Sequence, residues 1–262
     1  MNQEVLKVRM FGKFTLIYGD RQISCDNTRS KQIWSILAYL IYYRDRSVSS
    51  EELLGLMRNS NKNGNPTGAM RATMHRVRTL LESVMPAFGR QILVYKNGSY
   101  MWDPQVPVEL DVDAFDSLLS SVSKENDPDD LDRYVAALNL YDGQFLSLQS
   151  SEIWVMSRQV YYHELYESIV QKALPLLEKT GRYAEAMVIC QKALQIDPYS
   201  EPMYQHLMRF LLNLDKRQDV VALYEHMMKL LLETFGVMPD QEAAPSTGKP
   251  LRPSTRVYSR RK

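Results

Sequence analysis

The chain has 262 residues, of which 45% are hydrophobic and 24% charged, and this excludes global disorder and a collagen-like composition. Two isolated cysteines, Cys25 and Cys190, predict neither a disulfide framework nor a cysteine-based zinc site. No stretch reaches the ~18 apolar residues of a membrane span, and the first residues form no apolar signal segment. We therefore expect a cytoplasmic protein with no membrane partner.

The net charge of +1 conceals an uneven distribution along the chain. Residues 1–105 carry 15 basic and 8 acidic side chains, residues 106–240 carry 11 and 22, and residues 241–262 carry 6 and 1. Such asymmetry points to a nucleic-acid partner. Together with Pro104 and Pro107, it predicts a DNA-binding domain at 1–105, a second domain at 110–240 and a disordered basic tail at 241–262.

The first 25 residues have the pattern of a short antiparallel meander. Apolar and polar residues alternate over 5–11 and again over 14–17, with the period of half-buried strands. Gly19-Asp20 predicts a turn, after which residues 21–23 pair back.

Three helices are predicted next. Residues 31–43 repeat apolar side chains at helical spacing, and a second helix begins at Ser49 with a capping box in which Glu52 reaches back to the cap. A polar loop at 58–68 leads into a third helix from about Pro66 to Ser83. No acidic residue occurs between Glu52 and Glu82, so the exposed face of the third helix is basic.

The two faces of the third helix differ in character. Met70, Met74, Val77 and Leu81 share the apolar face with Thr73 and Leu80, whereas the opposite face carries Gly68, Arg71, Ala72, His75 and Thr79. Arg76 and Arg78 flank that second face. We expect Arg71, His75 and Thr79 to contact base edges and Arg76 and Arg78 to contact phosphates. The plainer alternative is a charged helix face that is merely solvated.

A hairpin follows the third helix. Strand-like residues 92–95 and 100–102 flank Lys96-Asn97-Gly98-Ser99, and Asn-Gly between two such runs is a strong hairpin signal. The order of strands, three helices and hairpin predicts a winged helix-turn-helix with an N-terminal sheet and double-stranded DNA as partner. The candidate DNA contacts of the wing are Lys96, Asn97, Ser99 and Tyr100.

The acidic second half is predicted to be all α-helical, which makes the whole chain mostly α. Asp113 is a candidate N-cap, Asp127-Pro128 begins a helix whose apolar side runs from Leu131 to Tyr141, and a long helix from about Ser151 contains Pro175, which would kink or end it. Residues 181–198 match the second half of a tetratricopeptide repeat (TPR), and a 34-residue shift gives a weaker copy with Asp215 in place of Gly181. Cys190 is then a packed small hydrophobe.

The sequence favours no enzyme, cofactor or metal site. A phosphate-binding GxxxxGK[ST] loop is absent, and Gly248-Lys249-Pro250 lacks the upstream glycine. The four histidines, at 75, 163, 206 and 226, have no metal-ligand spacing. The clustered carboxylates near residue 128 are interpreted as helix caps.

Several motifs resemble those of SARP-type (antibiotic regulatory protein) transcriptional regulators, which join an OmpR-like winged helix to a bacterial transcriptional activator domain. In the third helix these are Met70-Arg71, Met74, Arg76-Val77-Arg78 and Leu81, and in the wing Asn97-Gly98-Ser99-Tyr100. Further along the chain the motifs are Leu110 to Phe115, Tyr141 to Leu146, Leu207-Met208-Arg209 and Leu232 to Pro239.

The resemblance implies an activator that binds direct repeats in promoters, pairs as a homodimer on DNA and recruits RNA polymerase. The alternative is a TPR-type adaptor that grips peptides and uses the winged helix for protein contacts. The two differ in a simple observable, because only DNA binding should weaken steeply with salt.

Overall fold

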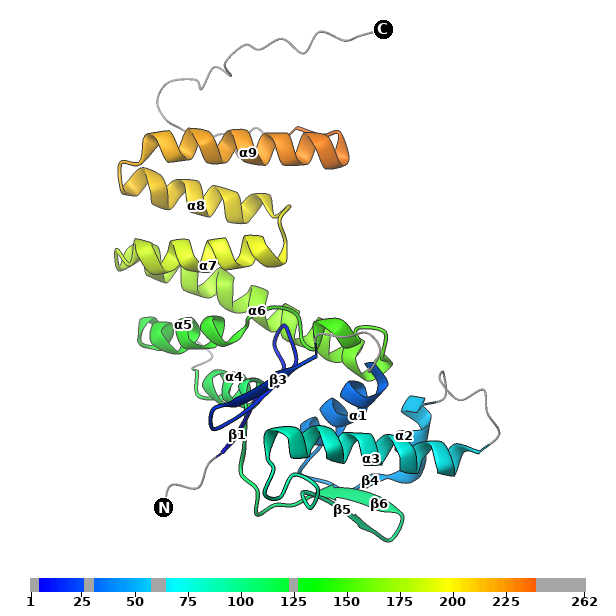
Figure 1. Ribbon diagram of the computed structural model, residues 1–262. Coiled ribbons are helices and arrows are strands. Elements are labelled where there is room, and N and C mark those ends of the chain that lie inside the picture. Colours follow the sequence, from blue (N-terminus) through cyan, green and yellow to red (C-terminus); the bar gives the residue numbers. More distant parts are fainter. Residues whose placement is uncertain (1–4, 26–30, 58–64, 123–126, 239–262) are drawn as a thin grey trace, which may run out of the picture. The chain divides into compact units, whose positions relative to one another are not determined.

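The computed structural model describes residues 5–25, 31–57, 65–122 and 127–238 (Figure 1). Two compact units make up the chain, the first formed by Met1–Glu125 with Asp132–Ile169 and the second by Asn126–Leu131 with Val170–Lys262. The predicted tail and most of the predicted polar loop, residues 58–64, lie outside the described residues.

The first unit opens with a four-stranded sheet of order β3-β2-β1-β7. The predicted meander is confirmed as β1 (Leu6–Arg9), β2 (Thr15–Tyr18) and β3 (Arg21–Ser24), which pair antiparallel. The fourth strand, β7 (Val108–Leu110), pairs parallel with β1 across about a hundred residues of sequence, and the sequence analysis missed it. The sheet buries Leu6, Val8 and Leu16, the inward positions of the alternation.

The three predicted helices are present as α1 (Lys31–Tyr42), α2 (Ser50–Met57) and α3 (Pro66–Val84). A second small sheet, of order β4-β6-β5, completes this part. Its strands β5 (Leu93–Lys96) and β6 (Ser99–Trp102) form the predicted hairpin, and β4 (Val48–Ser49) joins it just before α2. These elements make the predicted winged helix-turn-helix.

An aromatic cluster joins the β1 sheet to the first helices of the acidic half, within the first unit. Phe11 packs its ring against Phe115 of α4 (Asp111–Ser120), Tyr141 and Tyr162, with ring centroids 4.9–5.2 Å apart. Tyr141 follows α5 (Leu131–Leu140), and Tyr162 lies in the first half of α6 (Ile153–Lys179). All four rings are nearly inaccessible to solvent, so they form one continuous core.

Asp111 ties the end of β1 to the start of α4. Its carboxylate accepts hydrogen bonds from the backbone N–H groups of Met10, at 2.8 and 2.9 Å, and of Phe11, at 2.9 Å. Asp113, the predicted N-cap, is instead in the first turn of α4, whose cap position is Leu110, and it pairs with Arg44. That prediction was wrong because β7 leads directly into the helix, so that the N-cap lies three residues earlier than predicted.

One of the two hydrogen bonds of the predicted capping box of α2 is present. The backbone N–H of Glu52 donates to Ser49 Oγ at 3.0 Å, as predicted. The Glu52 carboxylate does not close the box, because it accepts hydrogen bonds from Arg46 and Tyr39.

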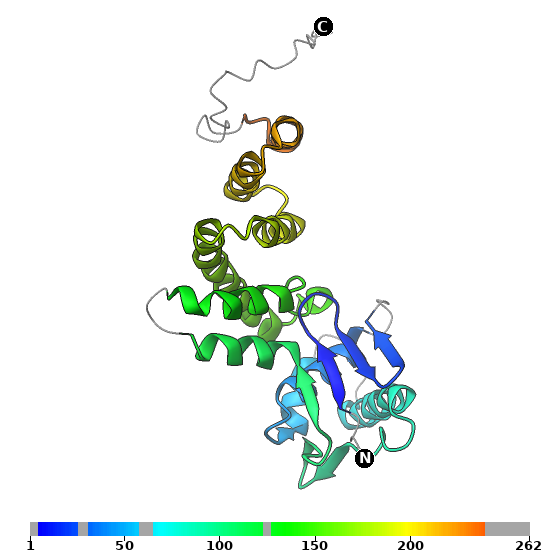
Figure 2. The same ribbon diagram turned by 90° about the vertical axis from the view of Figure 1, so that its left-hand side faces the viewer.

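The second unit contains three stacked helices that Figure 2 shows nearly end-on, α7 (Tyr183–Ile196), α8 (Glu201–Asn213) and α9 (Arg217–Phe235). The predicted repeat is visible in the turns that precede α7 and α9. Gly181 and Asp215, 34 residues apart, both have left-handed backbone, with φ of 72° and 55°. In each turn the next N–H donates to the carbonyl five positions earlier, at 2.9 Å.

Three further expectations concern the helices of the second half of the chain. α6 continues past Pro175 to Lys179, so this proline does not end it. Cys190 is buried in α7, as predicted, and burial raises the pKa of its thiol to about 12. Asp127 caps the short 3-10 turn Pro128–Asp130 before α5 by accepting from the N–H of Asp129.

The predicted domain bounds, 1–105 and 110–240, stay a prediction. The compact units divide the chain at residue 169, inside α6, and not near residue 105. The physical reason is that β7, Asp111 and the aromatic cluster join the first helices of the acidic half to the winged helix.

Candidate nucleic-acid interface

Helix α3 begins with a cap that the sequence analysis overlooked. Asn65 is the N-cap residue, its Oδ1 accepts from the N–H of Gly68 at 2.9 Å, and Pro66 occupies the first turn. A β-carbon on Gly68 would lie 2.9 Å from the Asn65 amide nitrogen, so the absence of a side chain lets this cap close. Asn followed by Pro is itself the sequence signal for such a start.

The two predicted faces of α3 are present. The apolar face is buried except for the half-buried Leu80, while Arg71, Ala72, His75, Arg76 and Thr79 are exposed. The Thr79 hydroxyl donates to the carbonyl of His75 at 3.1 Å, which orients this side chain along the helix. Within the part of the chain that the structure describes, no acidic side chain pairs with Arg71 or Arg76. Both guanidinium groups can therefore meet an external anion.

Arg78 has a different environment from the other two arginines. It is half-buried and donates from a guanidinium nitrogen to the carbonyl of Leu93 in β5, at 2.9 Å. This bond joins α3 to the wing, so Arg78 positions the hairpin in addition to any phosphate contact. Sequence periodicity placed Arg78 on the flank of the helix but could not show that its partner is a backbone carbonyl.

Tyr100 departs from the predicted surface set. Its side chain is only 6% exposed, and its ring packs against Tyr95 with centroids 4.7 Å apart. Burial raises the pKa of its hydroxyl, while the nearby charges of Arg78 and Arg71 act to lower it. Tyr100 is thus a buried residue that packs within the wing, and this burial does not favour its predicted contact with DNA.

The tip of the wing has the turn geometry that Asn-Gly requires. Asn97 and Gly98 both have positive φ, 52° and 78°, as in a type I′ turn. Lys96 and Asn97 are exposed and Ser99 is half-buried. The backbone N–H and the hydroxyl of Ser50, at the start of α2, both donate to the carbonyl of Gly98, at 2.9 and 2.7 Å. The wing is therefore held from two sides, by α2 and by α3.

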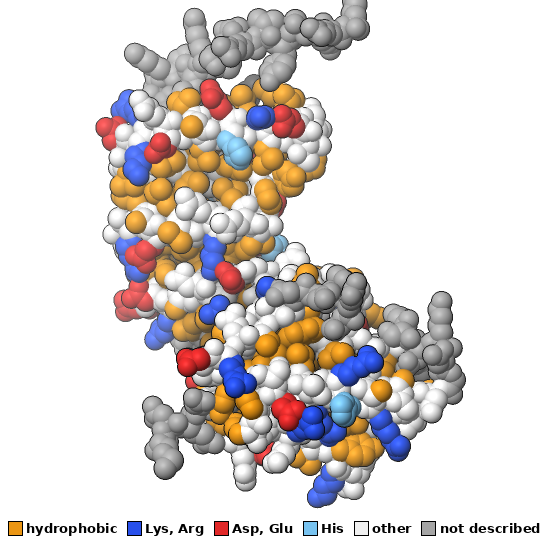
Figure 3. Space-filling model, viewed as in Figure 1, with side chains coloured by type: hydrophobic (Ala, Val, Ile, Leu, Met, Phe, Trp, Pro, Cys, Tyr) orange, Lys and Arg blue, Asp and Glu red, His pale blue; other side chains and the backbone are white. Residues whose placement is uncertain are grey.

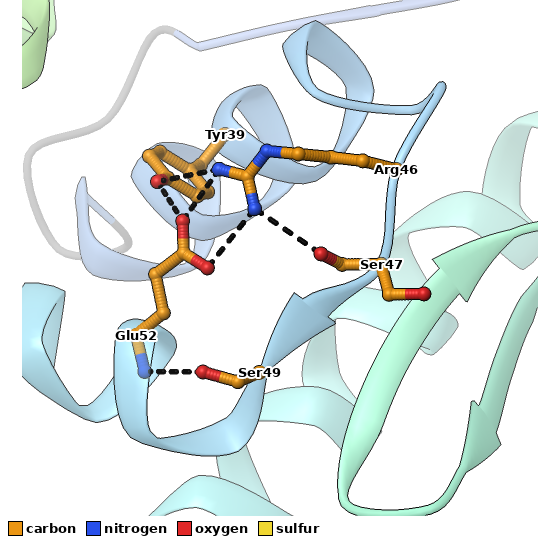
Figure 4. Close-up of polar contacts among 5 residues, drawn as sticks. All are labelled: Tyr39, Arg46, Ser47, Ser49 and Glu52. Atoms are coloured by element: carbon orange, nitrogen blue, oxygen red, sulfur yellow. Dashed lines mark hydrogen bonds and ion pairs between the residues drawn. The ribbon is translucent and has the colours of Figure 1, made fainter.

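A polar network sets the position of α2 relative to α1 (Figure 4). Arg46 donates to both oxygens of the Glu52 carboxylate, at 2.5 and 3.0 Å, and to the hydroxyl of Tyr39 at 3.2 Å. The Arg46 guanidinium holds the pKa of Glu52 below its usual range. A bidentate pair of this kind fixes geometry as well as charge. The turn between α1 and α2 is therefore held by Glu52, which the sequence analysis assigned only to helix capping, and by Arg46 and Tyr39, to which it gave no role.

The exposed surface of α3 adjoins an open hollow. His75, Arg76 and Thr79 line one side of it, Ile33 and Trp34 of α1 line the other, and its volume is about 470 Å³. Figure 3 shows Lys and Arg side chains gathered over the part of the first unit that contains α3 and the wing. The arrangement offers positive charge, an imidazole and a hydroxyl on one convex helix face.

The described residues indicate neither a metal site nor a membrane-spanning segment. No three His, Cys, Asp or Glu side chains among these residues are grouped to hold a metal ion. In the same ranges, no helix is both long enough and apolar enough to cross a bilayer.

Comparisons with known proteins bear on the second half of the chain and on the overall fold. The family model described as "Bacterial transcriptional activator domain" matches residues 110–245. The fold is similar to that of Mycobacterium tuberculosis EmbR, solved in complex with a low affinity phosphopeptide, with a TM-score of 0.58 and 15% sequence identity. That match covers 92% of this chain and 63% of the EmbR chain, so the present chain spans less than two thirds of its length. No curated protein matches in sequence.

Proposed function

The chain belongs to the bacterial transcriptional activator domain family, and on that basis we propose that it is an activator that binds specific promoter DNA through α3 and the wing. Family membership confirms the predicted resemblance to SARP-type regulators that carry such a domain. The observation that carries the proposal is the exposed face of α3, which has two arginines and a histidine, while the single acidic residue of this helix, Glu82 in its last turn, is paired with Arg90.

The shape of this face suits a major groove. The major groove of B-DNA is wide enough to admit an α-helix, whose side chains then reach the base edges. Ala72 and Gly68 supply close approach, and Arg71 is the side chain best suited to a bidentate contact with guanine. Arg76, on the flank, is placed to meet the phosphate backbone.

The wing supports the same orientation. Lys96 and Asn97 are exposed at its tip, and the bonds from Ser50 and Arg78 hold the hairpin beside α3. A preorganised hairpin loses little conformational entropy when it contacts a phosphate. We assign Lys96, Asn97 and Ser99 to backbone or minor-groove contacts.

The proposal extends to tandem promoter repeats, two copies of the chain on neighbouring half-sites, and recruitment of RNA polymerase. These features are what the SARP resemblance implies. A single winged helix contacts only a short site, so two copies are needed for useful specificity.

The test begins with genome-wide mapping of bound sites, which also yields the operator. Binding of the full chain to that operator is then measured by fluorescence anisotropy over a series of salt concentrations. We expect affinity to fall steeply with salt, and Arg76→Gln to reduce the slope of log K against log salt by about 1. Arg217→Gln, an exposed arginine on α9 of the second unit, is the matched control.

One outcome would contradict the proposed DNA binding. If no promoter is enriched and affinity for DNA does not depend on salt, the surface of α3 does not bind DNA. The adaptor hypothesis would then be favoured.

A further inference from the structure

The hollow between α1 and α3 has the size and the lining of a small-molecule site. α1 packs against α3 (Figure 1), and the hollow between their exposed sides has a volume of about 470 Å³. Sites for small organic ligands measure about 300–1,000 Å³ and combine a mostly apolar lining with a few polar groups. We call this feature the α1–α3 hollow.

The apolar part of the lining is already ordered in the folded chain. Trp34 of α1 is buried, and its ring packs edge-on against Phe14 with centroids 5.6 Å apart. Ile33 of α1 and Leu80 of α3 are half-buried beside it. A ligand that covers these side chains removes apolar surface from water and orders little of the protein.

The polar part of the lining offers one strong hydrogen-bond donor group. The hydroxyls of Thr79 and Ser83 donate to the carbonyls of His75 and Leu80 in their own helix, at 3.1 and 2.6 Å. Their protons are therefore engaged within α3. The guanidinium of Arg76 is exposed and supplies several N–H groups, with the imidazole of His75 beside it.

The charge of the lining selects the charge of the ligand. Among the residues that the structure describes around the hollow, none is acidic, and Glu82 of the same helix is bonded to Arg90 at 2.6 Å. A cationic ligand would meet no counter-charge here, whereas an anionic head group can accept charge-assisted hydrogen bonds from Arg76. The indole of Trp34 favours a flat aromatic body, because aromatic rings gain from contact beyond the burial of their area.

We propose that the α1–α3 hollow binds a small aromatic anion, such as an aromatic carboxylate, and that this ligand competes with DNA. The competition rests on the proposed function. Arg76 and His75 line the hollow and also belong to the exposed side of α3 that is proposed to meet DNA. An anion bound to Arg76 occupies the donors that a phosphate would use, so the two cannot bind this side chain together.

The first test is a titration of the full chain with naphthoate, followed by nuclear magnetic resonance in the absence of DNA. We expect naphthoate to bind with a dissociation constant of about 1 mM or lower. Naphthamide, which has the same rings without the charge, should bind at least about tenfold more weakly. Equal affinity for the two compounds, or no binding of naphthoate, would overturn the proposal.

Two arginine variants locate the bound anion. Arg76→Gln should weaken naphthoate binding at least about tenfold and leave the weaker binding of naphthamide unchanged. Arg71→Gln is the matched control, because Arg71 is an exposed arginine of the same helix that does not line the hollow. If both variants lose affinity for naphthoate equally, the anion is attracted by the general charge of α3 and not held in the hollow.

Cysteine labelling tests whether the hollow is open. Both native cysteines are buried, so Thr79→Cys introduces an accessible thiol among the lining residues. Saturating naphthoate should slow its alkylation by iodoacetamide and should not slow that of Val188→Cys, an exposed position on α7. Residues 26–30, which precede α1, lie outside the described residues. A thiol at position 79 that is protected without naphthoate would show that the chain itself covers the hollow and would overturn the proposal.

A competition measurement separates this proposal from the proposed function. At constant ionic strength, naphthoate at about ten times its dissociation constant should raise the apparent dissociation constant for a mapped operator about elevenfold. Naphthamide at the same concentration should leave it nearly unchanged. Naphthoate binding with no effect on operator affinity would refute the competition. A chain that binds naphthoate in the hollow but no promoter DNA would refute the DNA proposal alone.

Discussion

Arg71 and Arg78 lie on one helix, yet their surroundings assign them different roles. Arg71 is exposed, whereas Arg78 is bonded to the carbonyl of Leu93. We expect Arg71→Ala to cost ~1–3 kcal/mol of binding and to relax sequence preference at one base pair. The free energy of unfolding of the Arg71→Ala protein should differ from that of the unchanged protein by no more than about 0.5 kcal/mol, as for most surface substitutions.

Arg78→Ala is the matched comparison for that prediction. It should weaken binding to all sequences alike and lower the free energy of unfolding by about 1 kcal/mol, because the bond to the wing is lost. Binding to an operator and its single-base variants, with urea unfolding of each protein, measures both effects. Unchanged base preference in Arg71→Ala would show that this side chain does not face base edges.

Asp111 makes the stability of the first unit depend on pH. Burial raises the pKa of its carboxyl to about 6, although the N–H groups of Phe11, Met10 and Val112 act to lower it. The folded protein therefore binds this proton more tightly than the unfolded chain. Its contribution to stability is full below about pH 4 and is lost as the pH rises to about 6, a change of at most ~3 kcal/mol.

Asp111→Asn should remove this dependence. Both carboxyl oxygens accept from backbone N–H groups, and the amide nitrogen that replaces one of them cannot accept, so the variant is also less stable, by about 1–3 kcal/mol. Urea unfolding between about pH 4 and pH 7 checks both statements, since the difference between the two proteins should be largest at the acidic end. If the two proteins differ in free energy of unfolding by the same amount at every pH, the pH dependence does not come from Asp111.

At the scale of elements, the wing depends on one glycine. Gly98 has a φ of 78°, and a β-carbon there would meet no atom within 4 Å, so Gly98→Ala is opposed by backbone strain alone. We expect a loss of about 1–2 kcal/mol in the free energy of unfolding.

Gly55 provides a control of opposite sign. It lies inside α2, where a β-carbon would also meet nothing within 4 Å and no strained φ is present. Gly55→Ala should therefore raise the free energy of unfolding by about 0.5–1 kcal/mol. Thermal or urea unfolding measures both variants, and an equal effect in the two would refute the turn argument.

At the scale of the whole molecule, the winged helix depends on residues beyond its own sequence. A fragment of residues 1–108 lacks Asp111 and the rings of Phe115, Tyr141 and Tyr162 that cover Phe11. We expect this fragment to lose cooperative unfolding and to bind a hydrophobic dye, whereas a fragment of residues 1–179 unfolds cooperatively. Equal thermal midpoints for the two fragments would show that residues 1–108 are sufficient.

The elements of this fold could be predicted because their signals are local. The meander, α1 to α3 and the Asn97-Gly98 hairpin each follow from periodicity or turn chemistry within about 20 residues. The repeat turns at Gly181 and Asp215 follow from a 34-residue period. The same holds for the exposed face of α3, since helical spacing alone separates Arg71 and His75 from Met70 and Met74.

What the sequence by itself determined is thus the order and type of the elements, the charge of each region and the family resemblance. Only the tertiary structure decided how the elements are held together. The pairing of β7 with β1, the Asp111 bonds to Met10 and Phe11, the Arg78 bond to the wing and the burial of Tyr100 join residues whose proximity no local pattern encodes. Their physical basis is that buried polar groups need partners and buried rings need neighbours, and the folded chain supplies both from up to about a hundred residues away.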